Sequence, residues 1–383
     1  MIAPETDLFA SKVERDRLAR RMTAPAVTAE MEWEETLLPA GSVPAELEAE
    51  VRRQFGAVPS WVARVAPAPW VVRAWATMVT QPVAHLPPGI GDLAALVVSQ
   101  DNSCRYCFGA QRAVLRMLGY REAYIARLER DFHVAELSDA ERAALDFARR
   151  MSRADPRPAR AERERLAQVG FTAPAVAELA FVAAAIVFAN RAATLLALPP
   201  DPLEQMVDRP LVRLLRPVIA RRMRSKPRRP EPLPEPNEGP FASVVAALEG
   251  SPAAGVLRRA IDGALASPVL PRRTKMLLFA VVARALGCTR TESEMRAALA
   301  LESLGTADVE GILATLASSR LDARETRLVP FARETVRYHR IAAVQRRMRE
   351  VARGLEPAEI VETVGLLALA NAVCRLSVLL DAA

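Results

Sequence analysis

The sequence contains few aromatic residues and little glycine. Phe, Trp and Tyr make up 5% of the 383 residues, and 16 Gly stand against 29 Pro. β-Sandwiches and barrels need β-branched and aromatic residues at every second position, so this composition argues against both. The apolar fraction of 51% is nevertheless enough to fill buried cores. The chain is therefore predicted to be all-α, with its prolines at helix starts and in linkers.

Cysteine and histidine are also scarce, with four Cys and three His. These numbers exclude a disulfide scaffold and most multi-metal sites, so no metal site is predicted. The sequence also lacks a GxGxxG motif, a P-loop and a haem or flavin motif, so no bound cofactor is predicted.

Long hydrophobic runs are missing as well. The first 25 residues mix charges throughout and lack the apolar segment of a signal peptide. The longest apolar run, Leu179–Ala189, ends at Asn190 and Arg191, whereas a membrane-spanning helix needs roughly 20 such residues. We therefore expect a buried core helix there, no transmembrane segment, and a soluble, cytoplasmic protein in a reducing compartment.

The net charge of +7 is concentrated in one segment. Residues 209–229 hold nine Arg or Lys and no acid, and a Pro-rich stretch follows. One interpretation is contact with an anionic partner, such as a membrane surface, a nucleic acid or an acidic protein. The other is a solvated connector that docks on its neighbours through an apolar helix face broken at Pro217. No aromatic residue lies among these cations, so specific nucleic-acid binding is not predicted.

The chain resembles itself at one constant offset, which indicates an internal duplication. Residues 86–104 align with 270–288, residues 141–149 with 325–333, and residues 190–196 with 374–380. The predicted organisation is two tandem helical bundles joined by a linker. Its parts are an N-terminal extension (1–40), a first domain (41–202), the basic Pro-rich linker (203–240) and a second domain (241–383).

The sharpest chemical motif is Cys104-Arg105-Tyr106-Cys107. With Ser103 as the predicted N-cap, both thiols lie in the first turn of a helix, three residues apart, where a disulfide forms with little strain. The helix dipole and Arg105 are expected to stabilise a thiolate. Gln111 follows Cys107 by one turn, and Asp92 precedes Cys104 by twelve residues, on the helix expected to pack beside it.

Two interpretations compete with redox chemistry at this motif. A zinc knuckle needs two more ligands, and neither the other cysteines nor the three histidines have the required spacing. The pair can also be two inert, buried thiols. A thioredoxin-like site is not indicated, because the βαβ context is absent.

The segment LVVSQDNSCRYCFGAQ resembles the core of the alkyl hydroperoxidase D-like, carboxymuconolactone decarboxylase superfamily. The pattern of that superfamily is Glu, eleven residues, Cys-x-x-Cys, three residues and His. Residues 52–75, 137–150 and 188–202 resemble its flanking segments, in the peroxidase-related subgroup. The resemblance implies an all-α fold and homo-oligomers. A tandem chain then forms either a dimer or a trimer that imitates a hexamer.

The resemblance also implies roles for individual residues. Cys107 corresponds to the thiol that attacks peroxide, and Cys104 to the thiol that resolves the sulfenic acid. Asp92 stands at the Glu position and Gln111 at the His position. Gln cannot relay a proton at neutral pH, so we expect weak peroxidase activity with thiol–disulfide exchange retained.

Three further residues are assigned auxiliary roles: Tyr106, which replaces a residue that is sometimes His, Arg105, and His85, a candidate substitute for the missing imidazole. The second copy keeps Cys288 but has Thr291, Met295 and Met276 where the first has Cys107, Gln111 and Asp92. We expect that copy to be catalytically inactive, with Cys288 and Cys374 as buried apolar thiols.

Three functions remain open. The first is a CxxC thiol oxidoreductase with an antioxidant role, acting on a small peroxide or on a thiol–disulfide protein partner. Its only redox group is the Cys104–Cys107 disulfide. The second is a non-catalytic scaffold built from a duplicated, degenerate fold. The third is non-redox chemistry on the same fold, such as a decarboxylation or a biosynthetic step.

Overall fold

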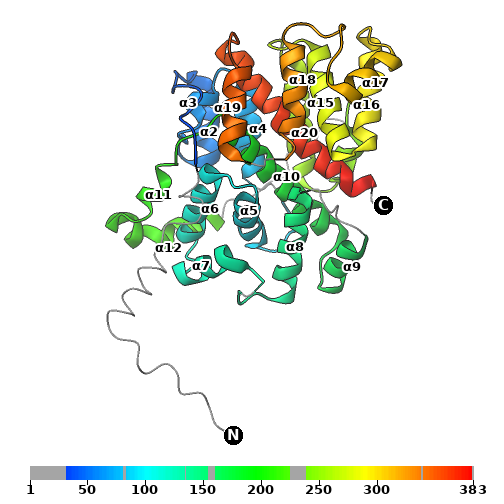
Figure 1. Cartoon of the computed structure of the whole chain (residues 1–383). Helices are drawn as coiled ribbons and strands as arrows, with labels where there is room; N and C mark the ends of the chain where they lie inside the picture. The colour runs from blue at the N-terminus through cyan, green and yellow to red at the C-terminus, as the bar shows by residue number, and fades with distance from the viewer. Residues whose placement is uncertain are drawn as a thin grey trace, which may run out of the picture.

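The computed structural model describes residues 32–80, 83–133, 135–153, 160–224, 239–337 and 340–381. Within these residues the chain is helical and contains no β-strand, so the all-α prediction is confirmed (Figure 1). The N-terminal half contains α2 (Ala45–Phe55), α3 (Val62–Val65), α4 (Pro69–Val79), α5 (Ile90–Asp101), α6 (Arg105–Met117), α7 (Glu122–Asp131), α8 (Asp139–Arg153), α9 (Arg160–Gln168) and α10 (Ala173–Leu195).

Two helices connect the halves, α11 (Leu203–Met206) and α12 (Pro210–Arg224). The C-terminal half contains α13 (Ala242–Ala246), α14 (Pro252–Ala266), α15 (Arg272–Leu286), α16 (Thr289–Leu301), α17 (Thr306–Thr315), α18 (Glu325–Glu334), α19 (Ile341–Val351) and α20 (Pro357–Asp381). The predicted N-terminal extension lies mostly outside the described residues, as does the Pro-rich part of the linker, residues 225–238.

The helices follow local sequence signals. Ser138 and Glu141 form a reciprocal capping box at the start of α8, in which each backbone amide donates to the other side chain at 2.8 and 3.2 Å. The Thr172 hydroxyl caps α10 by accepting from the Ala175 amide at 3.3 Å. Pro174, in the first turn of α10, has no amide proton to leave unpaired there.

The doubled architecture predicted from the sequence is present in the helices themselves. The starts of α6 and α16, of α7 and α17, and of α10 and α20 are all separated by the same offset, the one that aligns Cys104 with Cys288. In Figure 1, α5–α9 and α15–α18 lie in different parts of the molecule, with α10 and α20 between them. The same order of helices is therefore used twice.

The two halves share one hydrophobic core. Helix α10 packs along α20, and α4 packs against α14. Both α10 and α20 are long and apolar enough to cross a membrane, but 83% and 100% of their apolar windows are buried inside the protein. They are core helices here, as we predicted for the Leu179–Ala189 run.

Two buried arginines join the halves reciprocally. Arg191 of α10 donates to the Val336 carbonyl at 2.9 Å, just after α18, and Arg375 of α20 donates to the Ser152 carbonyl at 2.7 Å, in the last turn of α8. Cations at helix C-termini stabilise carbonyls that have no partner within the helix. A buried arginine is expected to have a carboxylate or carbonyl partner, and Arg191 also donates to the Asn102 side chain at 2.7 Å.

Two buried glutamates reinforce the same interface. Glu178 of α10 accepts from the backbone amides of residues 84–86 and from the Ser251 hydroxyl of the C-terminal half. Glu362, at the equivalent position of α20, accepts from the Trp70 indole at 2.9 Å and pairs with Lys275 at 3.0 Å. Buried carboxylates are tolerated only when hydrogen-bonded or paired, so these contacts fix how the halves meet.

The basic connector differs from our expectation. Helix α12 is continuous, with Pro217 inside it, although we expected a break at that residue. The side chains of Leu214 and Val218 are exposed, at 77% and 65%. Ile219 is half-buried, Ala220 is buried and α12 contacts α6, so the docking that the second interpretation required is present only in part. The contact with an anionic partner stays a prediction.

Candidate thiol site

The CxxC motif lies at the turn between α5 and α6. Ser103 does not cap α6, because its φ of +52° places it in the left-handed region. The N-cap is Cys104, whose sulfur accepts a hydrogen bond from the Cys107 amide at 3.3 Å. The prediction of the cap was therefore wrong by one residue, while the prediction that the motif opens a helix is confirmed.

The protein interior surrounds both sulfurs. Cys104 is fully buried, and Cys107 is 5% exposed. Burial raises the pKa of the Cys107 thiol well above its ordinary value, and the neighbouring Cys104 thiol raises it further. This corrects our expectation of a stabilised thiolate at Cys107. Arg105 instead lies near Glu204, where it opposes the rise that burial causes in the pKa of that carboxyl.

The sequence analysis missed one residue of the site, Asn190. Its side chain hydrogen-bonds the Cys107 thiol and lowers the pKa of that thiol, and its Nδ2 donates to Ser99 at 3.2 Å. Its Oδ1 is buried with no hydrogen-bond donor among the described residues. The available signal was the interruption of an apolar run by a polar amide. What the sequence could not give is the packing of α10 over the start of α6.

Asp92 lies away from the sulfurs, near the other end of α5. Asp92 is in the first turn of α5, nine residues before the end that leads to the motif, which is about 14 Å along a helix. Gln111 is half-buried on α6, which packs against α5. Asp92 therefore does not touch the thiols directly.

Two of the auxiliary residues, Tyr106 and His85, have polar contacts with groups other than the cysteines. The Tyr106 hydroxyl donates to Asp201 at 2.6 Å, and burial raises the pKa of Tyr106, with the Asp201 charge adding to that effect. His85 precedes α5, at the helix end opposite the motif, and its exposed ring has Nε2 3.3 Å from the Gly250 carbonyl. The structure therefore does not bring the His85 imidazole to the cysteines.

The equivalent place in the C-terminal half also holds two thiols. Cys288 is the N-cap of α16, with nearly the same backbone angles as Cys104. Thr291 replaces Cys107 as expected, but Cys374 of α20 occupies the position of Asn190 and hydrogen-bonds Cys288. That contact is the largest of those that lower the pKa of Cys288 to about 6, against the opposing effect of burial. Both thiols are fully buried, as we expected, but they adjoin each other.

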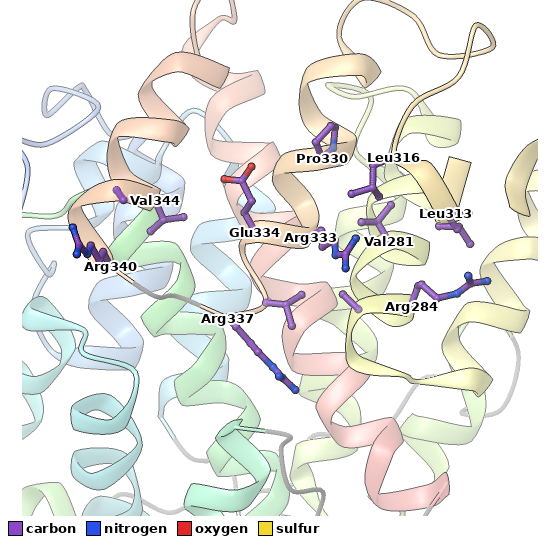
Figure 2. Close-up of a pocket in the computed structure, with 14 residues that line it drawn as sticks. Val281, Arg284, Leu313, Leu316, Pro330, Arg333, Glu334, Arg337, Arg340 and Val344 are labelled. Atoms are coloured by element: carbon purple, nitrogen blue, oxygen red, sulfur yellow. The ribbon is translucent and has the colours of Figure 1, made fainter. Parts of the chain in front are cut away.

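A separate cleft of about 860 Å³ lies in the C-terminal half (Figure 2). Its walls come from α15, α18, α19 and the end of α17, and no cysteine lines it. The apolar side chains of Val281, Leu313 and Leu316 face a rim that includes Arg333 and Arg340. No group of three or more His, Cys, Asp or Glu able to hold a metal occurs among the described residues.

Two solved structures are similar to part of the chain. One is the alkylhydroperoxidase AhpD core, an uncharacterized peroxidase-related protein from Ralstonia eutropha JMP134, at 23% identity and a TM-score of 0.41 over 45% of this chain and 96% of that chain. The other is an uncharacterized peroxidase-related protein from Silicibacter sp. TM1040, at 27% identity and a TM-score of 0.40 over 45% of this chain and 95% of that chain. No protein-family model and no curated protein matches the sequence. Each match covers less than half of this chain and nearly all of the other protein.

Proposed function

We propose that the chain is a CxxC thiol oxidoreductase in which Cys104 and Cys107 cycle between dithiol and disulfide. The observation that carries the proposal is the 3.3 Å hydrogen bond from the Cys107 amide to the Cys104 sulfur. This hydrogen bond holds the Cys104 sulfur over the first turn of α6, and Cys107 is part of that turn. Two cysteines so placed can join with little movement of the backbone.

The cycle balances with a hydroperoxide as the oxidant. The Cys107 thiolate attacks one peroxide oxygen, the O–O bond breaks, and the alcohol or water leaves with a proton. The Cys104 thiol then attacks the sulfenic acid sulfur, the S–O bond breaks, and water leaves as the disulfide forms. A dithiol protein or a small thiol returns the pair to the reduced state by exchange. The resemblance assigns the attacking role to Cys107, which is also the more exposed of the two residues, at 5%.

The surroundings favour a slow peroxidase. A raised pKa at Cys107 leaves little thiolate at neutral pH, and the thiolate is the nucleophile. The resemblance places Asp92 and Gln111 at the two positions of a carboxylate–imidazole proton relay, and Tyr106 and Arg105 lie between the two cysteines. Gln111 has no ionisable proton to relay, so any acid–base help comes through water.

Trapping experiments test this cycle. Peroxide treatment followed by alkylation under denaturing conditions should leave Cys104 and Cys107 unalkylated and cross-linked in the mass spectrum. Cys107→Ser should abolish peroxide turnover, whereas Cys104→Ser should accumulate a sulfenic acid at Cys107 that dimedone captures. Asp92→Asn measures whether the carboxylate contributes to the rate. Two free thiols after peroxide treatment would refute the cycle.

The burial of both thiols favours a second candidate, a non-catalytic scaffold. In that case the reciprocal contacts of Arg191 and Arg375 hold the two halves of the chain together. The chain then forms a homo-oligomer in the cytoplasm and catalyses no reaction. The Cys104→Ser/Cys107→Ser variant separates the two candidates. A scaffold keeps its oligomeric state and its biological role in that variant, while an oxidoreductase keeps the first and loses the second.

A further inference from the structure

All four cysteines of the chain lie in the two equivalent places of the duplicated fold. Cys288 stands at the position of the second copy that corresponds to Cys104, and both are helix N-caps. The second thiol of the C-terminal half lies on a different helix from that of Cys107, because Cys374 belongs to the core helix α20. Helix α16 packs against α20, and both sulfurs are fully buried. The N-terminal half places its two thiols on one helix, and the C-terminal half places its two on neighbouring helices.

Two hydroxyl groups adjoin Cys288. Thr291 and Ser377 are fully buried, and their hydroxyl oxygens have no hydrogen-bond partner among the described residues. Both lower the pKa of the Cys288 thiol, and they stand at the positions of Cys107 and Ala193 of the N-terminal half. Hydroxyls that donate to a sulfur stabilise its negative charge, and Cys374 does the same. The pKa of Cys288 is lowered to about 6, whereas burial raises the pKa of Cys374, so Cys288 is the thiol of this pair that more readily loses its proton.

We propose that Cys288 and Cys374 form a second redox-active dithiol, which a hydroperoxide oxidises to a disulfide that links α16 to α20. The Cys288 thiolate attacks a peroxide oxygen, the O–O bond breaks, and the alcohol or water leaves after taking a proton from solvent. The Cys374 thiol attacks the resulting sulfenic acid, its proton leaves with the hydroxyl as water, and the S–S bond forms. Two thiols are oxidised and one peroxide is reduced.

Access to this pair requires only a local opening. Thr289 and Arg290, which follow Cys288, are exposed, so the sulfur lies one residue below the surface at the end of a helix. Helix ends open far more often than the whole protein unfolds. A peroxide is small enough to enter through such an opening, whereas a protein disulfide is not.

The test uses the full chain with Cys104→Ser and Cys107→Ser, which leaves only the proposed pair. The folded protein is treated with hydrogen peroxide and then unfolded in N-ethylmaleimide. We expect two adducts before peroxide and none after it, with a cross-linked peptide pair that contains Cys288 and Cys374. Two adducts after peroxide, or oxidation to sulfinic acid without a cross-link, would overturn the proposal.

The matched control is Cys374→Asn, which places in the C-terminal half the residue that the N-terminal half has at Asn190. The cross-link should disappear, and dimedone should capture a sulfenic acid at Cys288. If the double serine variant does not fold, peptide mapping of the wild-type chain distinguishes the 104–107 bond from the 288–374 bond. The CxxC proposal is measured separately in Cys288→Ser/Cys374→Ser, so either site can fail without the other.

Discussion

The two halves of the molecule place their thiols differently on the same helical frame. In the N-terminal half, burial keeps Cys107 protonated beside a single amide, that of Asn190. In the C-terminal half, a thiol and two hydroxyls surround Cys288 and hold its pKa at about 6. The thiol whose pKa is lowered, Cys288, thus lies outside the motif that looks reactive in the sequence. A cysteine's reactivity follows from its neighbours across the helices, and the spacing of CxxC does not determine it.

The halves also differ in the buried charge that fixes each central helix. Glu178 is satisfied by three backbone amides, whereas Glu362 pairs with the buried Lys275, where the N-terminal half has Gly91. The Glu178 carboxylate therefore needs no cationic partner. A single substitution of the Glu362–Lys275 pair leaves an unpaired buried charge, so it should cost more stability.

The largest expected effect follows from that pair. Lys275→Met leaves the Glu362 carboxylate buried without its cation and should lower the free energy of unfolding by about 3–5 kcal/mol. Urea denaturation measures the loss. Lys275→Met/Glu362→Leu should recover much of it, because no unpaired charge remains. If the single variant is as stable as the wild type, Lys275 does not compensate the Glu362 charge.

The two reciprocal arginines should show the same asymmetry, with the C-terminal one contributing more to stability. Arg375 donates to the Ser152 and Val336 carbonyls and to Asn371, whereas Arg191 donates to Val336 and Asn102. Arg375→Met should cost about 3 kcal/mol, since hydrogen bonds from charged groups contribute about 1.5–3 kcal/mol each and the carbonyls stay buried. Arg191→Met should cost less. Equal losses in urea denaturation would contradict an asymmetric interface.

The sequence predicted much of the structure that the two halves share. The predictions that were wrong have physical causes. The constant offset between the two copies predicted the repeated helices because apolar periodicity and caps are local signals. Serine commonly precedes helices, which favours Ser103 as the cap, yet the matching residue Gly287, with a φ of +63°, marks this as a left-handed position. The Asn190 and Cys374 contacts depend on how α10 and α20 pack, and no local pattern encodes that.

The pH dependence of alkylation sharpens the contrast between the thiols. Thiolate is the reactive form, and its fraction rises about tenfold per pH unit below the pKa. In Cys288→Ser/Cys374→Ser, alkylation at Cys107 should climb steeply through pH 9, because its pKa is raised. In Cys104→Ser/Cys107→Ser, alkylation at Cys288 should be nearly flat above pH 7, because its pKa is about 6. If the rates at Cys107 and Cys288 depend on pH in the same way, the pKa values of the two thiols do not differ as we expect.

The smallest expected effect concerns Asn190. Asn190→Ala removes the hydrogen bond that lowers the pKa of Cys107, so alkylation of Cys107 at pH 8 should slow by a few-fold. Asn190→Ser, which keeps a polar hydrogen on a shorter side chain, serves as the matched control and should retain part of the rate. The rates are compared in the Cys288→Ser/Cys374→Ser background, so that only Cys104 and Cys107 react. An unchanged rate in Asn190→Ala would mean that burial and Cys104 set the acidity of Cys107 without Asn190, and α10 would then only cover the site.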